Sequence, residues 1–253
     1  MSLRLPLRLI FFVFAGILLF TGCSSFPGSK PSTLTTSQLE NLRKSKGNYH
    51  FSGRILFKHP KGKHSGELAL QISRNSELKL SIFTPFVGSL IYELRASNNK
   101  ILILNFQEKN FVLADNNQET RQTWLGMDIS LTELKWLILG QLPEKTPAWR
   151  RKKLSGGELL LTQGTTEIRL RFNASGQIET MHKFLEGLLE FRARIPIYQK
   201  HYDLPFPRKI SIEDYSGNSK WLMVFSEIQT PSGTMKALDL KPPPNLRQLK
   251  SNQ

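Results

Sequence analysis

Apolar and polar residues alternate with a period of two along most of the chain. Leu68, Leu70 and Ile72, for example, alternate with Glu67 and Gln71. Such alternation is typical of a β-strand with one buried face and one solvent-facing side. By the same pattern we predict strands over residues 51–58, 67–73, 78–83, 90–95, 100–106, 111–114, 158–162, 167–172, 177–184, 188–195, 208–213 and 221–228. The connections are short, so neighbouring strands should be antiparallel, in a sheet of the barrel or sandwich type.

Residues 116–140 interrupt this alternation and carry the signals of two helices. Ser130 and Glu133 fit a capping box, which marks a helix start. Gly140 stands where a helix commonly ends, and Asn117 fits the cap of a preceding helix. The apolar faces of these helices have to pack against the sheet, because the chain offers no other apolar surface of that size.

The start of the chain has the three-part pattern of a secretory signal. Arg4 and Arg8 supply positive charge, residues 9–20 are uncharged and apolar, and small residues precede Cys23. The apolar run is shorter than the roughly 20 residues of a transmembrane helix. This segment resembles a bacterial lipobox, with Phe20 where Leu is usual. We therefore expect cleavage before Cys23 and acylation of its thiol; the alternatives are an uncleaved anchor or an ordinary signal cut nearby.

Composition divides the rest of the chain. Residues 24–37 are rich in Ser, Thr, Pro and Gly and read as a flexible tether, with a short helix beginning near Ser37. The end of the chain, from Lys241, is polar and rich in Pro.

In lipoprotein families an Asp after the acylated cysteine retains the protein in the inner membrane, so Ser24 favours the outer membrane. We predict a signal peptide (1–22), a lipidated cysteine with its tether (23–37), one folded domain (38–238) and a disordered tail (239–253).

The chain is strongly basic, with 35 Lys and Arg against 20 Asp and Glu and a formal charge of +15. A location in the cell envelope excludes nucleic acid as a partner. Basic residues close to anionic headgroups contribute about 1 kcal/mol each, although a merely solvated basic surface has the same composition. The single cysteine excludes an internal disulfide and a Cys-rich metal site, and it avoids mispairing in an oxidising compartment.

Catalytic patterns are missing from the sequence. There is no G-x-S-x-G, P-loop, H-E-x-x-H or dinucleotide fingerprint. His59 and His64 flank a basic turn, but no carboxylate or thiol there completes a set of metal ligands. Glu158 and Glu167 fit the polar alternation of strands better than paired acid–base chemistry. We therefore predict no enzymatic activity, no cofactor and no metal site.

The segment TPFVGSLIYEL contains an unusual turn. Pro85 and Gly88 frame it, yet Phe86 and Val87 occupy the positions where polar turn residues are expected. Two interpretations are open. The loop either folds back and buries Phe86 in the core, or it forms an apolar tip that enters a lipid phase or contacts acyl chains.

The order of these features resembles the LolB family of outer-membrane lipoprotein receptors and insertases. The resemblance spans about residues 45–230 and includes the lipobox, the strand YHFSGRILF, the loop TPFVGSLIYEL and the segment HYDLPFPRKISIED. The family's helix stretch appears as Gly126, Met127, Ile129, Leu131, Leu134, Leu137, Gly140 and Pro143. The chain departs from the family in several ways: Trp136 lies one place before the Trp column, the loop has one extra residue, and the charge, the longer segment 184–195 and the tail differ. These differences leave open the possibility that the chain is a related lipoprotein with the same fold but different cargo.

The resemblance implies a mainly β fold, an unclosed antiparallel β-barrel with a helical lid over an apolar cavity. Each exposed methylene costs roughly 0.8 kcal/mol, so the acyl chains of a lipoprotein in water need such an enclosure. A filled core has the same alternation as a cavity wall, and periodicity does not separate the two. The side chains expected to line the cavity are Leu68, Leu70, Leu80, Ile82, Ile103, Leu134, Leu137 and Ile138.

The resemblance also implies a function. A membrane-anchored monomer would accept acylated lipoprotein cargo from a LolA-like periplasmic carrier and insert it into outer-membrane lipid without a nucleotide. Phe86 and Val87 would form the membrane-insertion loop. The alternative keeps the envelope location but assigns a structural or assembly role, in which the basic surface binds an anionic envelope polymer or lipid headgroups.

Overall fold

The computed structural model describes residues 47–59, 62–73, 77–141, 149–201, 204–215, 218–231 and 238–249. The chain divides into two compact units, residues 1–30 and 31–253, and all described residues belong to the second. The predicted signal peptide, Cys23, the tether and the helix near Ser37 therefore lie outside the described residues. Among the described residues, no helix has the length and apolar character needed to cross a bilayer.

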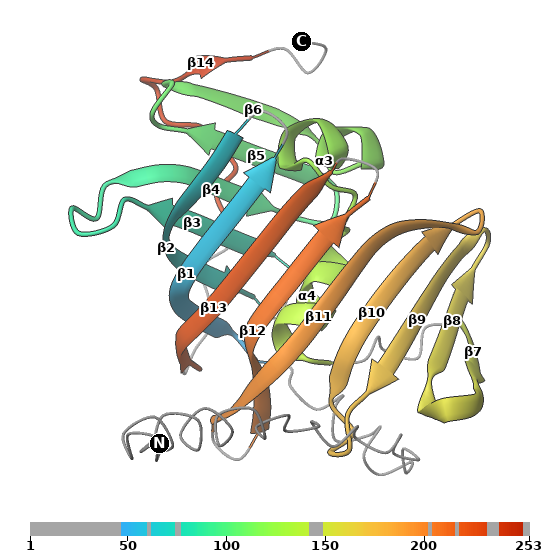
Figure 1. Ribbon diagram of the computed structural model, residues 1–253. Coiled ribbons are helices and arrows are strands. Elements are labelled where there is room, and N and C mark those ends of the chain that lie inside the picture. The colour runs from blue at the N-terminus through green and yellow to red at the C-terminus, as the bar shows by residue number, and fades with distance from the viewer. Residues whose placement is uncertain are drawn as a thin grey trace, which may run out of the picture. The chain divides into compact units, whose positions relative to one another are not determined.

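The described strands form a single 14-stranded sheet in the order β14-β6-β5-β4-β3-β2-β1-β13-β12-β11-β10-β9-β8-β7 (Figure 1). Neighbouring strands are antiparallel, except that β14 runs parallel to β6. The strands are β1 (Tyr49–His59), β2 (Gly62–Ile72), β3 (Leu78–Phe83), β4 (Leu90–Ala96), β5 (Lys100–Asn105), β6 (Asn110–Asp115), β7 (Arg150–Lys153), β8 (Leu159–Gln163), β9 (Thr166–Phe172), β10 (Ile178–Leu185), β11 (Leu188–His201), β12 (Leu204–Asp214), β13 (Ser219–Gln229) and β14 (Arg247–Gln248).

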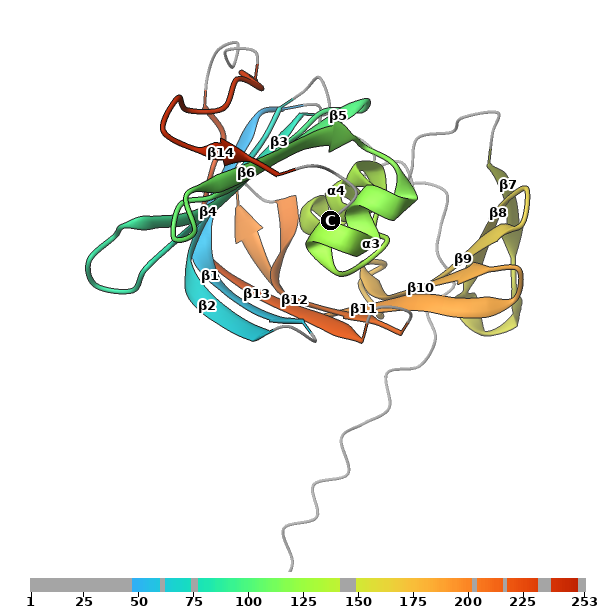
Figure 2. The ribbon, with the colours of Figure 1, turned by 90° about the horizontal axis from the view of Figure 1, so that it is seen from above.

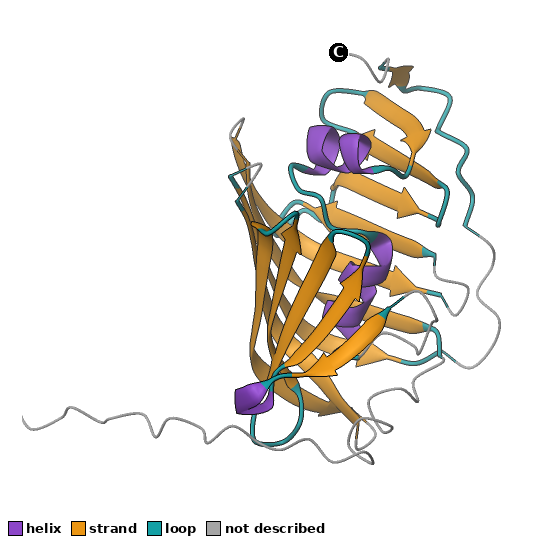
Figure 3. Ribbon diagram, turned by 90° about the vertical axis from the view of Figure 1, so that its right-hand side faces the viewer, coloured by secondary structure: helices purple, strands orange, loops and turns teal. Residues whose placement is uncertain are grey.

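Strand β1 joins the two halves of the sheet, because it pairs with its sequence neighbour β2 on one side and with the distant β13 on the other. Gly53 lies at a bulge in the β1–β13 pair, and a side chain there would collide with the backbone of Val224. The sheet curves around the helices without closing, with β14 and β7 at its two ends (Figures 2 and 3). This arrangement confirms the predicted mainly β, unclosed antiparallel fold.

Helices α3 (Gln118–Leu125) and α4 (Leu131–Leu139) lie on the concave side of the sheet (Figure 2). The capping box forms as predicted: the Glu133 backbone N–H donates to the Ser130 hydroxyl, and the Ser130 N–H donates to the Glu133 carboxylate. Helix α4 ends at Gly140 with a φ of 61°, in the left-handed region that glycine tolerates best. The preceding helix is capped by the predicted asparagine.

The C-terminal segment differs from the predicted disordered tail. Its strand β14 pairs with β6, and Leu246 is buried against the outward leucines of β5. The Arg95 guanidinium also donates to the carbonyl oxygen of Asp239 at 2.7 Å. The sequence of β5 explains the difference, because residues 101–104 are apolar on both faces of the strand, and the outward face needs a cover. The scattered leucines of this proline-rich segment carry no periodic signal that would predict this contact.

Candidate functional site

A cavity of about 430 Å³ lies between the inner face of strands β1 to β6 and helix α3. Its volume falls in the range of roughly 300–1,000 Å³ that is typical of sites for small organic ligands. Leu249 of the C-terminal segment also borders it. Much of the wall is apolar and includes Ile55, Leu80, Ile82, Ile103, Trp124 and Trp221.

Only part of the predicted lining reaches this cavity. Leu80, Ile82 and Ile103 are in its wall. The other predicted residues belong to the buried core and do not line this cavity: Leu68, Leu70, Leu134, Leu137 and Ile138. Helix α4 packs against β12, and its buried side chains belong to the same core cluster as Leu68 and Leu70. The predicted lid therefore divides into a helix that closes the core, α4, and a helix that borders the cavity, α3.

Sequence reasoning did not identify two large aromatic residues of the wall. Trp124 comes from helix α3, and Trp221 from the far strand β13. The Trp221 ring contacts Phe57 edge-on, with 5.6 Å between the ring centroids. Trp221 occupies an apolar position in its strand alternation, which is the signal that would have marked it as inward-facing.

Polar side chains also border the cavity. The Asn105 amide donates to the Tyr92 hydroxyl at 3.3 Å, and the Asn110 amide donates to the Glu108 carboxylate at 3.0 Å. Burial and then the negative charge of Glu108 raise the pKa of Tyr92, so its hydroxyl stays protonated at neutral pH. Apolar walls beside hydroxyl and amide groups suit an amphipathic ligand with a hydrocarbon part and a polar, hydrogen-bonding part. Among the described residues, no group of three or more His, Cys, Asp or Glu side chains could hold a metal ion.

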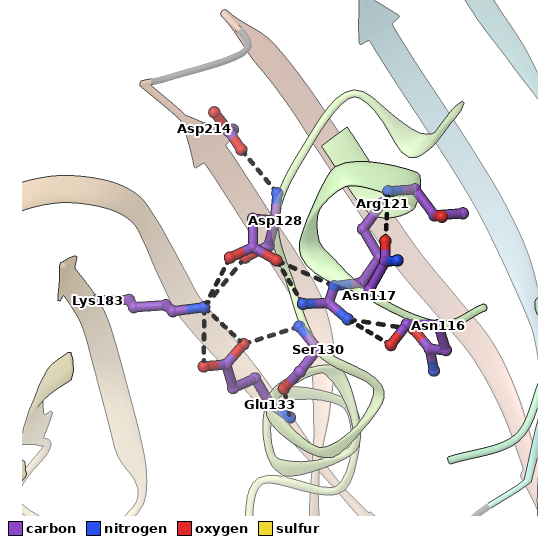
Figure 4. Close-up of polar contacts among 9 residues, drawn as sticks. Asn116, Asn117, Arg121, Asp128, Ser130, Glu133, Lys183 and Asp214 are labelled. Carbon is purple, nitrogen blue, oxygen red and sulfur yellow. Dashed lines mark hydrogen bonds and ion pairs between the residues drawn. The ribbon is translucent and has the colours of Figure 1, made fainter. Parts of the chain in front are cut away.

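A buried ionic cluster ties the helices to the sheet (Figure 4). The Lys183 ammonium of β10 lies 3.2 Å from the Asp128 carboxylate and 3.3 Å from that of Glu133. Arg121 of α3 donates to the other Asp128 oxygen at 2.6 Å. The Asp128 backbone N–H donates to Asp214 of β12. The charges of Lys183 and Arg121 thus offset those of Asp128 and Glu133, and the hydrogen bond to Asp214 adds a link to β12. Together these contacts hold α4 against the sheet.

Glu190 of β11 lies near this cluster and forms no ion pair with a described residue. One of its carboxylate oxygens is buried and has no hydrogen-bond partner among the described residues. Burial, followed by the charges of Asp128 and Asp214, raises its pKa, and Lys183 opposes that shift. The folded chain therefore binds the proton of the Glu190 carboxyl group more tightly than the unfolded chain does. As the pH rises through the folded pKa, ionisation of Glu190 lowers the free energy of unfolding.

We expect Glu190→Gln to increase the free energy of unfolding at about pH 8, because the neutral amide removes the ionised carboxylate. The gain should shrink as the pH falls through the raised pKa, since the parent carboxyl then becomes neutral as well. Urea unfolding across this pH range measures the effect. Glu186→Gln, in the exposed turn before β11, is the matched control and should change little. A gain that is independent of pH would contradict the prediction.

The loop between β3 and β4 projects away from the sheet (Figure 1). The Thr84 N–H donates to the Ser89 carbonyl at 2.8 Å, and the Ser89 N–H donates to the Thr84 hydroxyl at 3.0 Å, which closes the base of the loop. At its tip Phe86 is 105% exposed and Val87 is 79% exposed. Phe86 also has a φ of 69°, a conformation that bulky residues rarely adopt. The structure therefore has the exposed apolar tip and not the buried Phe86.

Solved structures of low sequence identity share this fold. One is a putative outer membrane lipoprotein-sorting protein domain from Vibrio parahaemolyticus, 9% identical, with a TM-score of 0.51 over 79% of this chain and 93% of that chain. Another is a LolA superfamily protein from Nitrosomonas europaea, 12% identical, with a TM-score of 0.52 over 78% of this chain and 93% of that chain. The chain shares its fold, a curved sheet around helices, with this LolA superfamily protein.

Within that class the sequence is more specific: the model of the family "Outer membrane lipoprotein LolB" matches residues 47–226, and the chain belongs to the LolB family. No curated protein sequence matches this chain. Membership confirms the predicted resemblance and the location as an outer membrane lipoprotein. The family is one of non-enzymatic lipoprotein receptors, in agreement with the predicted lack of enzymatic activity, and it implies a role in lipoprotein localisation that involves LolA and lipoprotein cargo.

Proposed function

We propose that this protein accepts acylated lipoproteins from a LolA-like periplasmic carrier and inserts them into the outer membrane. The cavity would hold acyl chain, and the tip formed by Phe86 and Val87 would contact the bilayer. One observation carries the proposal: the β3–β4 hairpin lines the cavity with Leu80 and Ile82 and bears the exposed apolar loop at its end. A single hairpin would thus link a site for hydrocarbon to a contact with lipid.

The energetics favour transfer without a nucleotide. A dozen methylenes exposed to water cost about 10 kcal/mol in total, so an acyl chain moves readily only between apolar surroundings. An apolar wall that leads from carrier to membrane avoids this cost. Tyr92 and Asn105 at the cavity border would meet the ester or amide groups at the polar end of the lipid.

We also propose that acylated Cys23 anchors the protein and that residues 24–37 hold the domain off the membrane surface. Several acyl chains on one residue give firm anchoring, because each buried methylene contributes roughly 0.8 kcal/mol. We propose that it acts as a monomer.

Filling the cavity tests the proposal. Ile103→Trp places a bulky ring in the wall of the cavity. We expect the affinity for a fluorescent acyl probe to fall by about tenfold or more, because the ring would keep a few methylenes of the probe from being buried in the cavity. Transfer of lipoprotein from the carrier should fall in parallel. Leu113→Trp, an exposed position on the neighbouring strand β6, is the matched control and should bind normally. Unchanged binding by a folded Ile103→Trp variant would refute the role of the cavity.

A further inference from the structure

Strands β1 and β13 turn their outer face away from the helices (Figure 2). This face carries an apolar strip. Leu56 of β1 pairs with Leu222 of β13, and Val224 occupies the next outward position of β13. Val224 is 37% exposed, and both leucines are partly exposed. The solvent face of an antiparallel sheet is normally polar, so an exposed run of this kind is typical of an interaction surface.

Basic residues border this apolar strip on both sides. On one side Lys58 of β1 lies between Lys220 of β13 and Lys63 of β2 in the strand register. On the other side Arg54 of β1 and Lys209 of β12 flank the exposed valine. A cationic border around apolar side chains is the composition of surfaces that bind the interface of an anionic membrane.

Acidic residues offset only part of this charge. The same rows contain Glu67 and Glu213, so five basic and two acidic residues leave 5 − 2 = +3. Lys220 is paired with Glu213 at 2.6 Å. The remaining basic residues of β1 and β2, Arg54, Lys58 and Lys63, form no ion pair with a described residue. Their charge is therefore available to an external partner.

A groove of about 410 Å³ connects the apolar strip to the exposed tip. Its lining includes Leu56, Leu222 and Val224 on the sheet, together with Pro85 and Phe86 of the loop. The fully exposed aromatic residue, the groove and the basic border therefore belong to one continuous surface.

We propose that this outer face docks onto bilayers that contain anionic phospholipid, with lipid chains against the groove and the basic residues at the level of the phosphates. The inference rests on the membrane contact of the Phe86 loop proposed above, and it adds a second contact. A contact at the loop tip alone leaves the domain free to rotate about that point, whereas contacts at the tip and on the outer face together set one orientation on the membrane. Attraction between the basic border and the anionic surface adds to burial of the apolar strip.

A fluorescent label on the groove tests this docking. Val224→Cys in the full-length protein is labelled with an environment-sensitive fluorophore and reconstituted into vesicles of phosphatidylethanolamine and phosphatidylglycerol. The parent chain, whose single cysteine is Cys23, gives the labelling background. We expect loss of most quenching by aqueous iodide and strong quenching by brominated lipid. A label on Ser175→Cys, in the exposed turn between β9 and β10, should stay accessible to iodide.

Charge reversal separates docking from simple proximity to the anchor. In the Arg54→Glu/Lys58→Glu/Lys63→Glu variant, the label at position 224 should regain iodide quenching, and high salt should act in the same direction. A label at position 224 that is equally accessible with and without vesicles would overturn the inference. A label on Val87→Cys tells the two proposals apart: a protected loop beside an accessible groove refutes only the docking face, whereas an accessible loop and groove refute the membrane role of the loop as well.

Discussion

Phe86→Glu is expected to block insertion of lipoproteins into vesicles while leaving the fold and cargo binding unchanged, and Val87→Glu is expected to do the same. Neither side chain contributes to the core, since Phe86 is 105% exposed and Val87 is 79% exposed. The free energy of unfolding should therefore change by no more than about 0.5 kcal/mol. Moving a carboxylate into a membrane costs roughly 3 kcal/mol, which corresponds to about a 100-fold loss.

A matched control is available elsewhere in the sheet. Leu188, at the turn between β10 and β11, is 73% exposed and lies on a hairpin with no proposed membrane contact. Leu188→Glu should therefore insert cargo at the parent rate in the same liposome assay. Parent rates for Phe86→Glu, for Val87→Glu and for the double variant would show that the loop has no role in insertion.

Lys183→Met is expected to destabilise the protein by about 3–5 kcal/mol, the usual effect of removing one partner from a buried ion pair. The side chain of Lys183 is 8% exposed and faces the carboxylates of Asp128 and Glu133 (Figure 4). Its removal leaves Glu133 without its cation, while Arg121 still neutralises Asp128. Chemical denaturation measures the change, and acyl-probe binding should weaken with it, since the cluster positions both helices.

The double variant Lys183→Met/Glu133→Gln distinguishes charge from packing. With the acid neutralised, the loss of the lysine leaves a smaller charge imbalance, so the double variant should be more stable than the sum of the two single changes predicts. Strict additivity would mean that Lys183 acts through its hydrocarbon stem alone.

The predicted strands and helices agree well with the structure because each signal is local. Alternation in segments such as 67–73 and 78–83 and the Ser130–Glu133 capping box depend only on nearby residues. Two strands were missed for the same reason. The four basic residues of β7 show no alternation, and β14 has two residues, so neither carries a periodic signal.

The ionic cluster was also invisible in the sequence. Lys183 occupies a buried position in β10, but in one dimension a lysine within a strand reads as a solvent-facing residue. Its partners are 50 and 55 residues away along the chain. Contacts between residues so far apart in the sequence depend on how the helices pack against the sheet, and local sequence patterns do not predict that packing.

By itself the sequence determined that the fold is mainly β, where the two helices begin and end, and that the turn at residues 85–88 is apolar, because these follow from periodicity, capping and composition over a few residues. Only the tertiary structure decided that Phe86 is exposed and where the interior is open. Leu70 and Leu80 have the same alternation, yet Leu70 is packed in the core and Leu80 lines the cavity. The difference arises from the helices, because empty volume is what remains after distant elements have packed together.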